Sequence, residues 1–198
     1  GVIEAGIKRD GSRNANADLI VDGQSVTNSG TQIASRTLDI RAAQKLDNRN
    51  GTLAGATNLI NAGQVDNRQG RLLAEKNLQL TIGSIENQGG LLESGADAQV
   101  TATGLVNNAT GDIRAGTHLS LNAGSLNNSQ KGIVASQSTA SLVTGQLDNR
   151  DGVISAKQGL DVTATRLDNR DSGLVVSEGT LQLDAAELDS SNNGEVSS

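Results

Sequence analysis

Aliphatic residues alternate with polar ones in short runs that return throughout the chain. In each run, every second residue is Leu, Ile, Val or Ala. A step of two places such side chains on one face of a β-strand, so the runs predict strands with one buried face. The clearest runs are Leu78-Leu80-Ile82, Leu119-Leu121-Ala123, Leu160-Val162-Ala164 and Leu181-Leu183-Ala185.

These runs belong to a repeat of 19 to 21 residues. The fragment Leu-Asp-Asn-Arg occurs at 46–49, 147–150 and 167–170, and Val-Asp-Asn-Arg occurs at 65–68. A fixed period of this length is typical of solenoid proteins, in which one repeat buries its apolar face only against its neighbours. The leading aliphatic residues of the units are Val26, Leu46, Val65, Ile85, Leu105, Leu126, Leu147, Leu167 and Leu188.

Three further positions of the repeat are almost constant. Two residues after the leading aliphatic comes an Asn in every unit but the last, which has Ser190: Asn28, Asn48, Asn67, Asn87, Asn107, Asn128, Asn149 and Asn169. Three or four residues later comes a Gly: Gly51, Gly70, Gly90, Gly111, Gly132, Gly152 and Gly173. The second residue after each Gly is aliphatic, and the fourth is small.

Each unit therefore predicts three short strands joined by turns. One strand ends at Leu-x-Asn, one runs Gly-x-Leu-x-Ala, and one runs Leu-x-Leu-x-Ala. Equivalent residues of successive units then stack about 4.8 Å apart. We expect an all-β fold, a right-handed parallel β-helix (solenoid) of about nine turns, because parallel crossover connections are almost always right-handed.

The recurring Asn has two interpretations. It could form a polar binding row, but a stacked ladder of side-chain amides at a tight turn is the better explanation. The following Gly would relieve the bend into the next strand. One-residue insertions between Asn and Gly are expected near Ala109-Thr110 and Gln130-Lys131. One register stays open, because either Leu59 or Asn58 could be the first inward residue of its strand.

The repeat divides the chain into three parts. Residues 1–25 predict an interrupted N-terminal turn, with Gly1, Ile3 and Ala5 in one strand and Leu19 and Val21 in another. The excursion between them carries Lys8, Arg9 and Arg13 and is a possible recognition loop, because an insertion that leaves the coil can bind what uniform turns cannot. Residues 26–187 predict the β-helix, and 188–198 a partial repeat. Both ends cut through repeats and Met is absent, so we expect an internal piece of a longer protein.

Composition narrows the classes of protein. The 198 residues include no Pro, Cys, Met, Phe, Tyr or Trp, so the core must be thin and aliphatic, without disulfides or thiolate metal sites. The net charge of −6 is spread evenly, which argues against nucleic-acid binding. No apolar run approaches the length of a membrane span, and nothing resembles a signal peptide.

The pattern Leu-Asp-Asn-x-x-Gly-x-Ile-x-Ala…Leu-x-Val-x-Ala, clearest in residues 147–164, resembles the repeat of the filamentous haemagglutinin family. These are long exoproteins of two-partner secretion systems in Gram-negative bacteria. The contact-dependent growth inhibition effectors of the CdiA family carry the same repeats and resemble the chain equally well. The resemblance implies a secreted, cell-surface filament, exported by an outer-membrane transporter and directed at a receptor on a target or host cell.

Candidate chemistry is sparse. His118 is the only histidine, and alternation turns it outward, beside the inward Leu119. Because it has no second His and no convergent pocket, neither a metal pair nor a Ser-His-Asp site is expected. We expect no cofactor. An enzyme acting on polysaccharide is the alternative function, and the lack of aromatic sugar platforms counts against it.

Acidic residues form a further row, directly after most of the leading aliphatics. Stacked carboxylates could attract Ca²⁺. However, Arg49, Arg68, Arg150 and Arg170 follow two residues on and could neutralise them diagonally, so a solvated charge ladder is the better interpretation. The row consists of Asp47, Asp66, Glu86, Asp148, Asp168 and Asp189.

Overall fold

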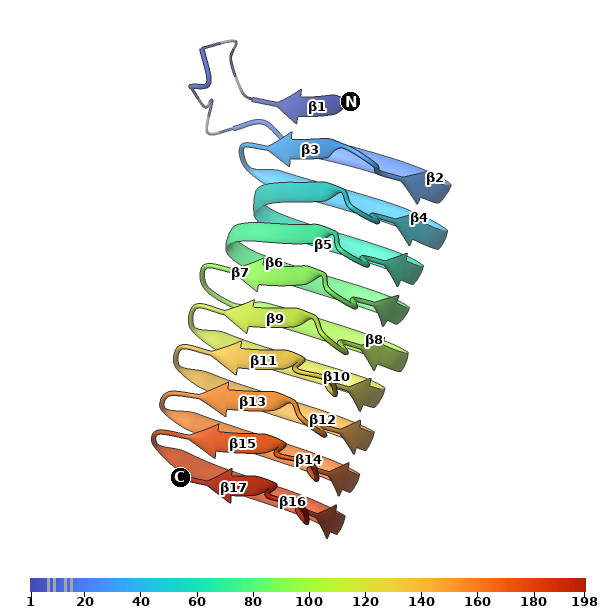
Figure 1. Cartoon of the computed structure of the whole chain (residues 1–198). Helices are drawn as coiled ribbons and strands as arrows, with labels where there is room; N and C mark the ends of the chain where they lie inside the picture. Colours follow the sequence, from blue (N-terminus) through green and yellow to red (C-terminus); the bar gives the residue numbers. More distant parts are fainter. Residues whose placement is uncertain (7, 9, 13, 15) are drawn as a thin grey trace.

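The computed structural model describes every residue of the chain except 7, 9, 13 and 15. The described residues form strands and turns without any helix, stacked as a single coil (Figure 1). One side of the coil consists of nine long strands: β2 (Leu19–Thr27), β4 (Thr37–Asp47), β5 (Thr52–Asp66), β6 (Arg71–Glu86), β8 (Ala98–Asn107), β10 (His118–Asn127), β12 (Thr139–Asp148), β14 (Gly159–Asp168) and β16 (Thr180–Asp189). The other side has short strands: β1 (Val2–Ala5), β3 (Thr31–Ala34), β7 (Leu91–Ser94), β9 (Asp112–Ala115), β11 (Ile133–Ser136), β13 (Val153–Ala156), β15 (Leu174–Ser177) and β17 (Glu195–Ser197).

Every strand pairs in parallel with the equivalent strand of the next turn. In the long strands β12 and β14, Leu147 lies opposite Leu167. In the short strands β11 and β13, Val134 lies opposite Ile154. The predicted parallel β-helix of about nine turns is therefore confirmed.

Each turn contains two strands and not the predicted three. The Leu-x-Leu-x-Ala segment continues into the Leu-x-Asn segment, with only a bend between them. In β12 the pairing with β14 passes from Thr144 to Gln146 and omits Gly145. A Cβ at Gly145 would lie 2.8 Å from the carbonyl oxygen of Gly124, so this bend has no room for a side chain, whereas Thr165 and Ala186 occupy the equivalent position in the next two turns.

In two turns the strand continues around the corner between the short and long segments, so β5 and β6 each contain both segments. In β5 the corner has one residue fewer, and Asn58 faces inward, opposite Leu38 and Leu78. Asn58 is fully buried and Leu59 is not, which settles the open register in favour of Asn58. Asn58 Nδ2 donates to the Leu73 carbonyl at 2.9 Å.

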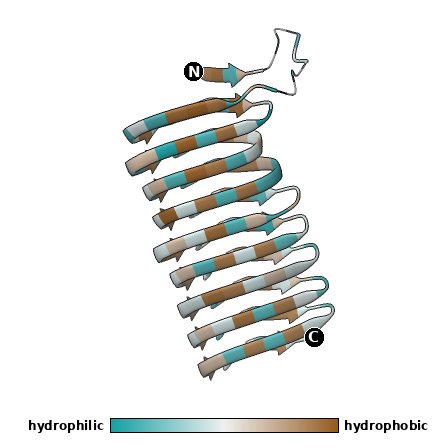
Figure 2. Ribbon diagram, turned by 180° about the vertical axis from the view of Figure 1, so that it is seen from behind, coloured by the Kyte–Doolittle hydropathy of each residue, from teal (hydrophilic) through white to brown (hydrophobic). Residues whose placement is uncertain are grey.

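The core is thin and aliphatic, as the composition predicts. Apolar and polar residues alternate along the long strands (Figure 2), and the apolar ones are buried inside the coil. Equivalent inward residues stack into rows that run the length of the coil. Burying each such side chain contributes about 1.5–3 kcal/mol. One row runs Ile40, Ile60, Leu80, Val100, Leu121, Leu142 and Val162.

The first turn is split by the excursion. β1 pairs with β3, with Val2 opposite Thr31, and β2 pairs with β4. The chain between them leaves the coil at one corner and returns to it (Figure 1). An ion pair between Asp18 and Arg36 joins the returning chain to the next turn.

Candidate functional site

Eight Asn side chains form the ladder in the described part of the chain. The Nδ2 of each of the first seven donates to Oδ1 of the Asn one turn further along, at 2.6–2.8 Å, and Asn169 Nδ2 donates to the carbonyls of Gly173 and Glu195. The same amide also approaches backbone carbonyls, so that Asn108 Nδ2 lies 3.0 Å from those of Gly111 and Ile133. The ladder satisfies the buried polar groups of the turn, which is a structural role. Its members are Asn28, Asn48, Asn67, Asn87, Asn108, Asn128, Asn149 and Asn169.

The prediction of Asn107 as a ladder residue was wrong by one position, because Asn108 takes that place. Asn108 is fully buried and occupies the ladder, whereas Asn107 is half-buried and turns outward. The leading aliphatic of this turn is accordingly Val106, and Leu105 is 36% exposed. The error arose because the extra residue lies before the turn, where the pairing with β10 shifts between Ala102 and Leu105.

The spacing from Asn to Gly follows the number of left-handed residues in the turn. Turns with a spacing of three contain one such residue, for example Thr110 with φ 60° between Asn108 and Gly111. Turns with a spacing of four contain two, for example Gln130 and Lys131. The insertion at Gln130-Lys131 is therefore confirmed, and the one at Ala109-Thr110 is wrong.

The conserved position of Gly in the repeat has a different cause from the one predicted. Among the described residues, none of the glycines that follow a ladder Asn at this position has a positive φ. Instead, a Cβ at Gly111 would lie 2.1 Å from the carbonyl oxygen of Asn87 and 2.8 Å from Asn108 Oδ1. Glycine is needed because the ladder leaves no room for a side chain beside it.

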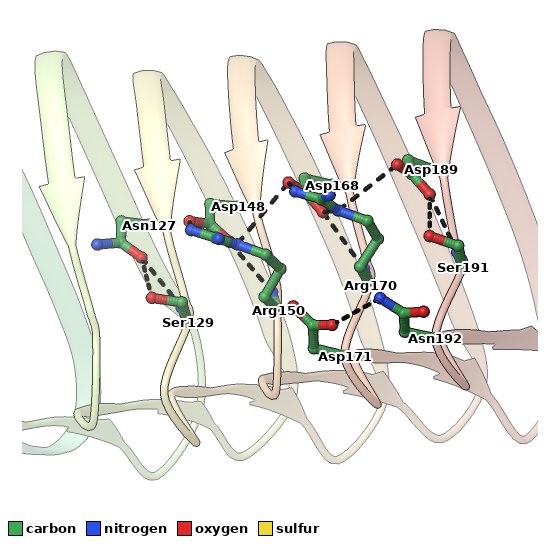
Figure 3. Close-up of polar contacts among 10 residues, drawn as sticks. All are labelled: Asn127, Ser129, Asp148, Arg150, Asp168, Arg170, Asp171, Asp189, Ser191 and Asn192. Carbon is green, nitrogen blue, oxygen red and sulfur yellow. Dashed lines mark hydrogen bonds and ion pairs between the residues drawn. The ribbon is translucent and has the colours of Figure 1, made fainter.

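The acidic row lies on the outside of the same turns (Figure 3). Asp148 Oδ1 accepts a hydrogen bond from the backbone N–H of Arg150 at 3.1 Å, and Asp189 Oδ1 does the same for Ser191 at 3.0 Å. An Asp or Asn that bonds the backbone two residues on forms an Asx-turn. The acids are thus first of all turn-forming residues.

The guanidinium groups pair the acids within and between turns (Figure 3). Arg150 Nη2 lies 2.6 Å from Asp148 Oδ2, and its Nε lies 3.7 Å from Asp168 Oδ2 in the next turn. Arg170 pairs in the same way with Asp168 at 2.8 Å and Asp189 at 3.5 Å. The predicted diagonal neutralisation is confirmed.

Asp66 is the most enclosed acid of the row, with 4% of its side chain exposed. Its Oδ2 lies 2.7 Å from Arg68 Nη2 and 3.6 Å from both Arg49 Nε and Lys45 Nζ. The hydrogen bond from Arg68, with a smaller contribution from the charge of Lys45, lowers the pKa of Asp66. The hydrogen bond from Arg170 lowers the pKa of Asp168 in the same way.

Neutral amides continue the row through the middle of the coil. Asn107 Nδ2 donates to Glu86 Oε2 at 2.7 Å, and Asn127 Nδ2 donates to Asn107 Oδ1 at 3.0 Å. Within the described residues, no three His, Cys, Asp or Glu side chains are grouped as they would be to bind a metal ion. The carboxylates of the row already have partners: Asp148 and Asp168 are bound by arginines and backbone N–H groups, and Glu86 by Asn107.

The two remaining predicted features lie at the surface. His118 is exposed, and its Nδ1 lies 2.7 Å from Thr139 Oγ1. Lys8 is exposed in the excursion, where its backbone N–H donates to the Ser12 carbonyl at 2.8 Å. Arg9 and Arg13 lie outside the described residues.

The chain matches one protein family over most of its length. The family model for the haemagglutinin repeat matches residues 5–50, 52–123 and 92–198. No curated protein and no solved structure shows significant similarity to the chain. Among the residues that the structure describes, no helix is long and apolar enough to cross a membrane. Because the repeat matches cover well over half of its residues, the chain belongs to the haemagglutinin repeat family.

Proposed function

We propose that this chain is a rigid stalk segment of a large secreted bacterial exoprotein. The haemagglutinin repeat and the β-solenoid fold both fit a filament segment of a secreted adhesin. The stalk would serve adhesion directly, or would hold a receptor-binding or toxin-bearing tip away from the cell, as in contact-dependent growth inhibition. Export through an outer-membrane transporter and recognition of a receptor on the target cell belong to this proposal.

The observation that carries it is the uniformity of the turns. Inward rows, the Asn ladder and the outer row repeat from turn to turn, and the ladder bonds vary only from 2.6 to 2.8 Å. A coil of nine turns at the strand spacing is about 43 Å long. Such a coil offers length and stiffness, and the excursion with Lys8 is the one departure from it that we propose for recognition.

Removal of one turn tests the proposal. Deleting residues 147–166 joins Gln146 to Leu167, and the pairing of β12 with β14 shows that this removes one whole turn in register. The parent protein should still reach the cell surface and bind target cells, with its reach shortened by about 5 Å. A deletion of residues 147–156 is the matched control, because it sets strand against turn and should prevent folding.

Loss of target-cell binding by the in-register deletion, with normal surface display, would show that these turns themselves form the receptor site. A second variant replaces excursion residues 8–13 with a Gly-Ser linker of equal length. Binding that is lost only in this second variant would assign recognition to the excursion. The alternative, an enzyme acting on polysaccharide, predicts depolymerisation of anionic glycans by the isolated chain.

A further inference from the structure

The outer face of the short strands carries a row of residues whose order is complementary to itself when reversed. The register of the strands stacks them one per turn. In sequence order the row is Glu4, Ile33, Ala54, Leu73, Glu93, Arg114, Ala135, Ser155, Val176 and Ser197. Opposite charges occupy the middle, small or apolar residues flank them, and the branched aliphatics Ile33 and Val176 lie one position from either end, before Glu4 and Ser197.

The neighbouring outward row makes the C-terminal half of this face apolar. Ile133, Val153 and Leu174 stack on three successive turns, next to Ala135 and Val176. All five are partly exposed. Adjacent aliphatic side chains on an outer sheet face mark an interaction site more often than scattered ones do.

The same face is hollowed along the charged row. A hollow of about 370 Å³ is lined by Ile33, Ala54, Leu73 and Glu93 among others. A second one of about 190 Å³ adjoins it and is lined by Glu93, Arg114 and Ala135 among others. The N-terminal half of the face is thus concave, while the C-terminal half presents aliphatic side chains that could fill this hollow.

We propose that two copies of this chain pair through the short-strand faces in antiparallel orientation. The two-fold axis would lie in the interface, along the strand direction, between the turns that contain Glu93 and Arg114. Glu93 of each copy then faces Arg114 of the other, so the interface gains two ion pairs at its centre. An isologous contact of this kind uses the same patch on both copies and closes the assembly at two.

Charge complementarity selects this orientation and register. Glu93 is exposed, and Arg114 keeps 43% of its side chain exposed despite its 3.2 Å contact with Asp112, so both can reach a partner. In the antiparallel register, Ile33 meets Val176, Ala54 meets Ser155, and Leu73 meets Ala135. If the two-fold axis moved by half a turn, to the turn that contains Arg114, the Arg114 side chains of the two copies would face each other. Repulsion between these like charges disfavours that register.

The area suits a weak, reversible dimer. Eight turns of about 4.8 Å and strands of about 13 Å bury on the order of 500 Å² per copy, near the lower limit for specific interfaces. Such a contact gains from repetition along a longer filament. If the stalk proposal holds, antiparallel pairing would join filaments that project from two facing cells.

Sedimentation equilibrium of the 198-residue chain tests the pairing without any target cell, so it is independent of the stalk proposal. The chain has no aromatic residue, and interference optics would therefore follow it. Between about 5 and 300 µM the mass should rise from 20.2 kDa toward twice that value. Glu93→Arg and Arg114→Glu should each weaken the dimer about tenfold or more, and the double charge swap should restore it.

Arg41→Glu is the matched control, since Arg41 lies on the long-strand side, and its dimer should be unchanged. The orientation is tested with single cysteines in this cysteine-free chain. Thr31→Cys mixed with Leu174→Cys should cross-link, whereas Thr31→Cys alone should not. A monomer at every concentration, unchanged dimers in both single charge variants, a double swap as weak as the singles, or self-cross-linking of Thr31→Cys would each overturn the proposal.

Discussion

Asn107 and Asn108 are adjacent in the chain, yet they belong to different rows of the coil. Asn108 Nδ2 donates to Asn128 Oδ1 at 2.8 Å inside the turn, and Asn107 Nδ2 donates to Glu86 Oε2 at 2.7 Å outside it. The inner row is dry, because Asn108 and Asn128 are fully buried. The outer row faces water. The two residues therefore provide a matched pair for measuring what the ladder contributes to stability.

Asn108→Ala should lower the free energy of unfolding by about 2–3 kcal/mol, because it removes two amide contacts and leaves buried partners short of a bond. Asn107→Ala should cost less than about 1 kcal/mol, since water replaces its contacts. Chemical denaturation followed by far-ultraviolet circular dichroism measures both. Equal losses in the two variants would contradict the structural role of the ladder.

Thr110 is the β-branched residue among the left-handed turn residues, with φ 60°. A β-branched side chain is strained in this conformation, and Asn tolerates it better. Thr110→Asn should therefore raise the free energy of unfolding by about 0.5–1 kcal/mol. Thr101→Asn, in the strand β8, is the control and should not stabilise. A thermal or chemical melt that ranks the two variants the other way would refute the assignment of strain.

Ser190 occupies the ladder position of the turn after Asn169. Its Oγ is buried and lacks a hydrogen-bond partner within the described structure, while Asn169 Nδ2 donates to the carbonyls of Gly173 and Glu195. Ser190→Asn should extend the ladder and raise the free energy of unfolding by about 0.5–1.5 kcal/mol. Ser120→Asn, on an exposed strand position, should have no such effect. Lower stability of the Ser190 variant would show that this end of the coil cannot accept the amide.

Ile154 lies in the dry core with none of its surface exposed, whereas Asp161 is exposed on β14. Ile154→Asp buries a carboxylate without a partner and should cost several kcal/mol, on the order of 3–5. Asp161→Ala should change stability by less than about 0.5 kcal/mol. The midpoints of denaturant unfolding give the comparison. Similar midpoints would mean that the inside and outside of this turn are assigned incorrectly.

Asp66 links the outer row to pH. Its pKa is lowered in the folded chain by the hydrogen bond from Arg68, so its contribution is complete above the unfolded pKa of about 4 and is lost as the pH falls through the folded value. Asp66→Asn should cost about 1–3 kcal/mol at pH 7, and its difference from the parent should shrink below pH 4. Asp161→Asn serves as control. A difference that stays constant down to pH 2 would contradict the assignment.

The sequence predicts the coil well because the inward rows and the Asn ladder follow a period that is visible in the sequence. Leu147 and Leu167 stack as their common fragment indicates. The prediction fails where two registers give the same spacing. Leu105 with Asn107 and Val106 with Asn108 both satisfy the pattern of an aliphatic residue followed by Asn two residues later. Only the bulge before Leu105, set by backbone pairing, decides between them.

The outer features were harder to predict. The pairing of Arg150 with Asp168 follows from stacking alone. The short-strand face does not, because residues such as Ile33 and Val176 lie in outward positions that carry no repeated residue type. Their relation emerges only when the register places them in one row. The excursion gives no period at all, and sequence reasoning there rests on composition.

The ladder has a direction. Every amide–amide bond of the ladder runs from the Nδ2 of one Asn to the Oδ1 of the Asn in the next turn toward the C-terminus. A coil folded as far as Asn128 therefore ends in an unused N–H donor and an unpaired strand edge. Residues of the next turn supply the partners of both. Each finished turn is in this sense a template for the next, because a repeat is stabilised only by its neighbours, and a chain that emerges with its N-terminal turns first would add new turns at its C-terminal edge.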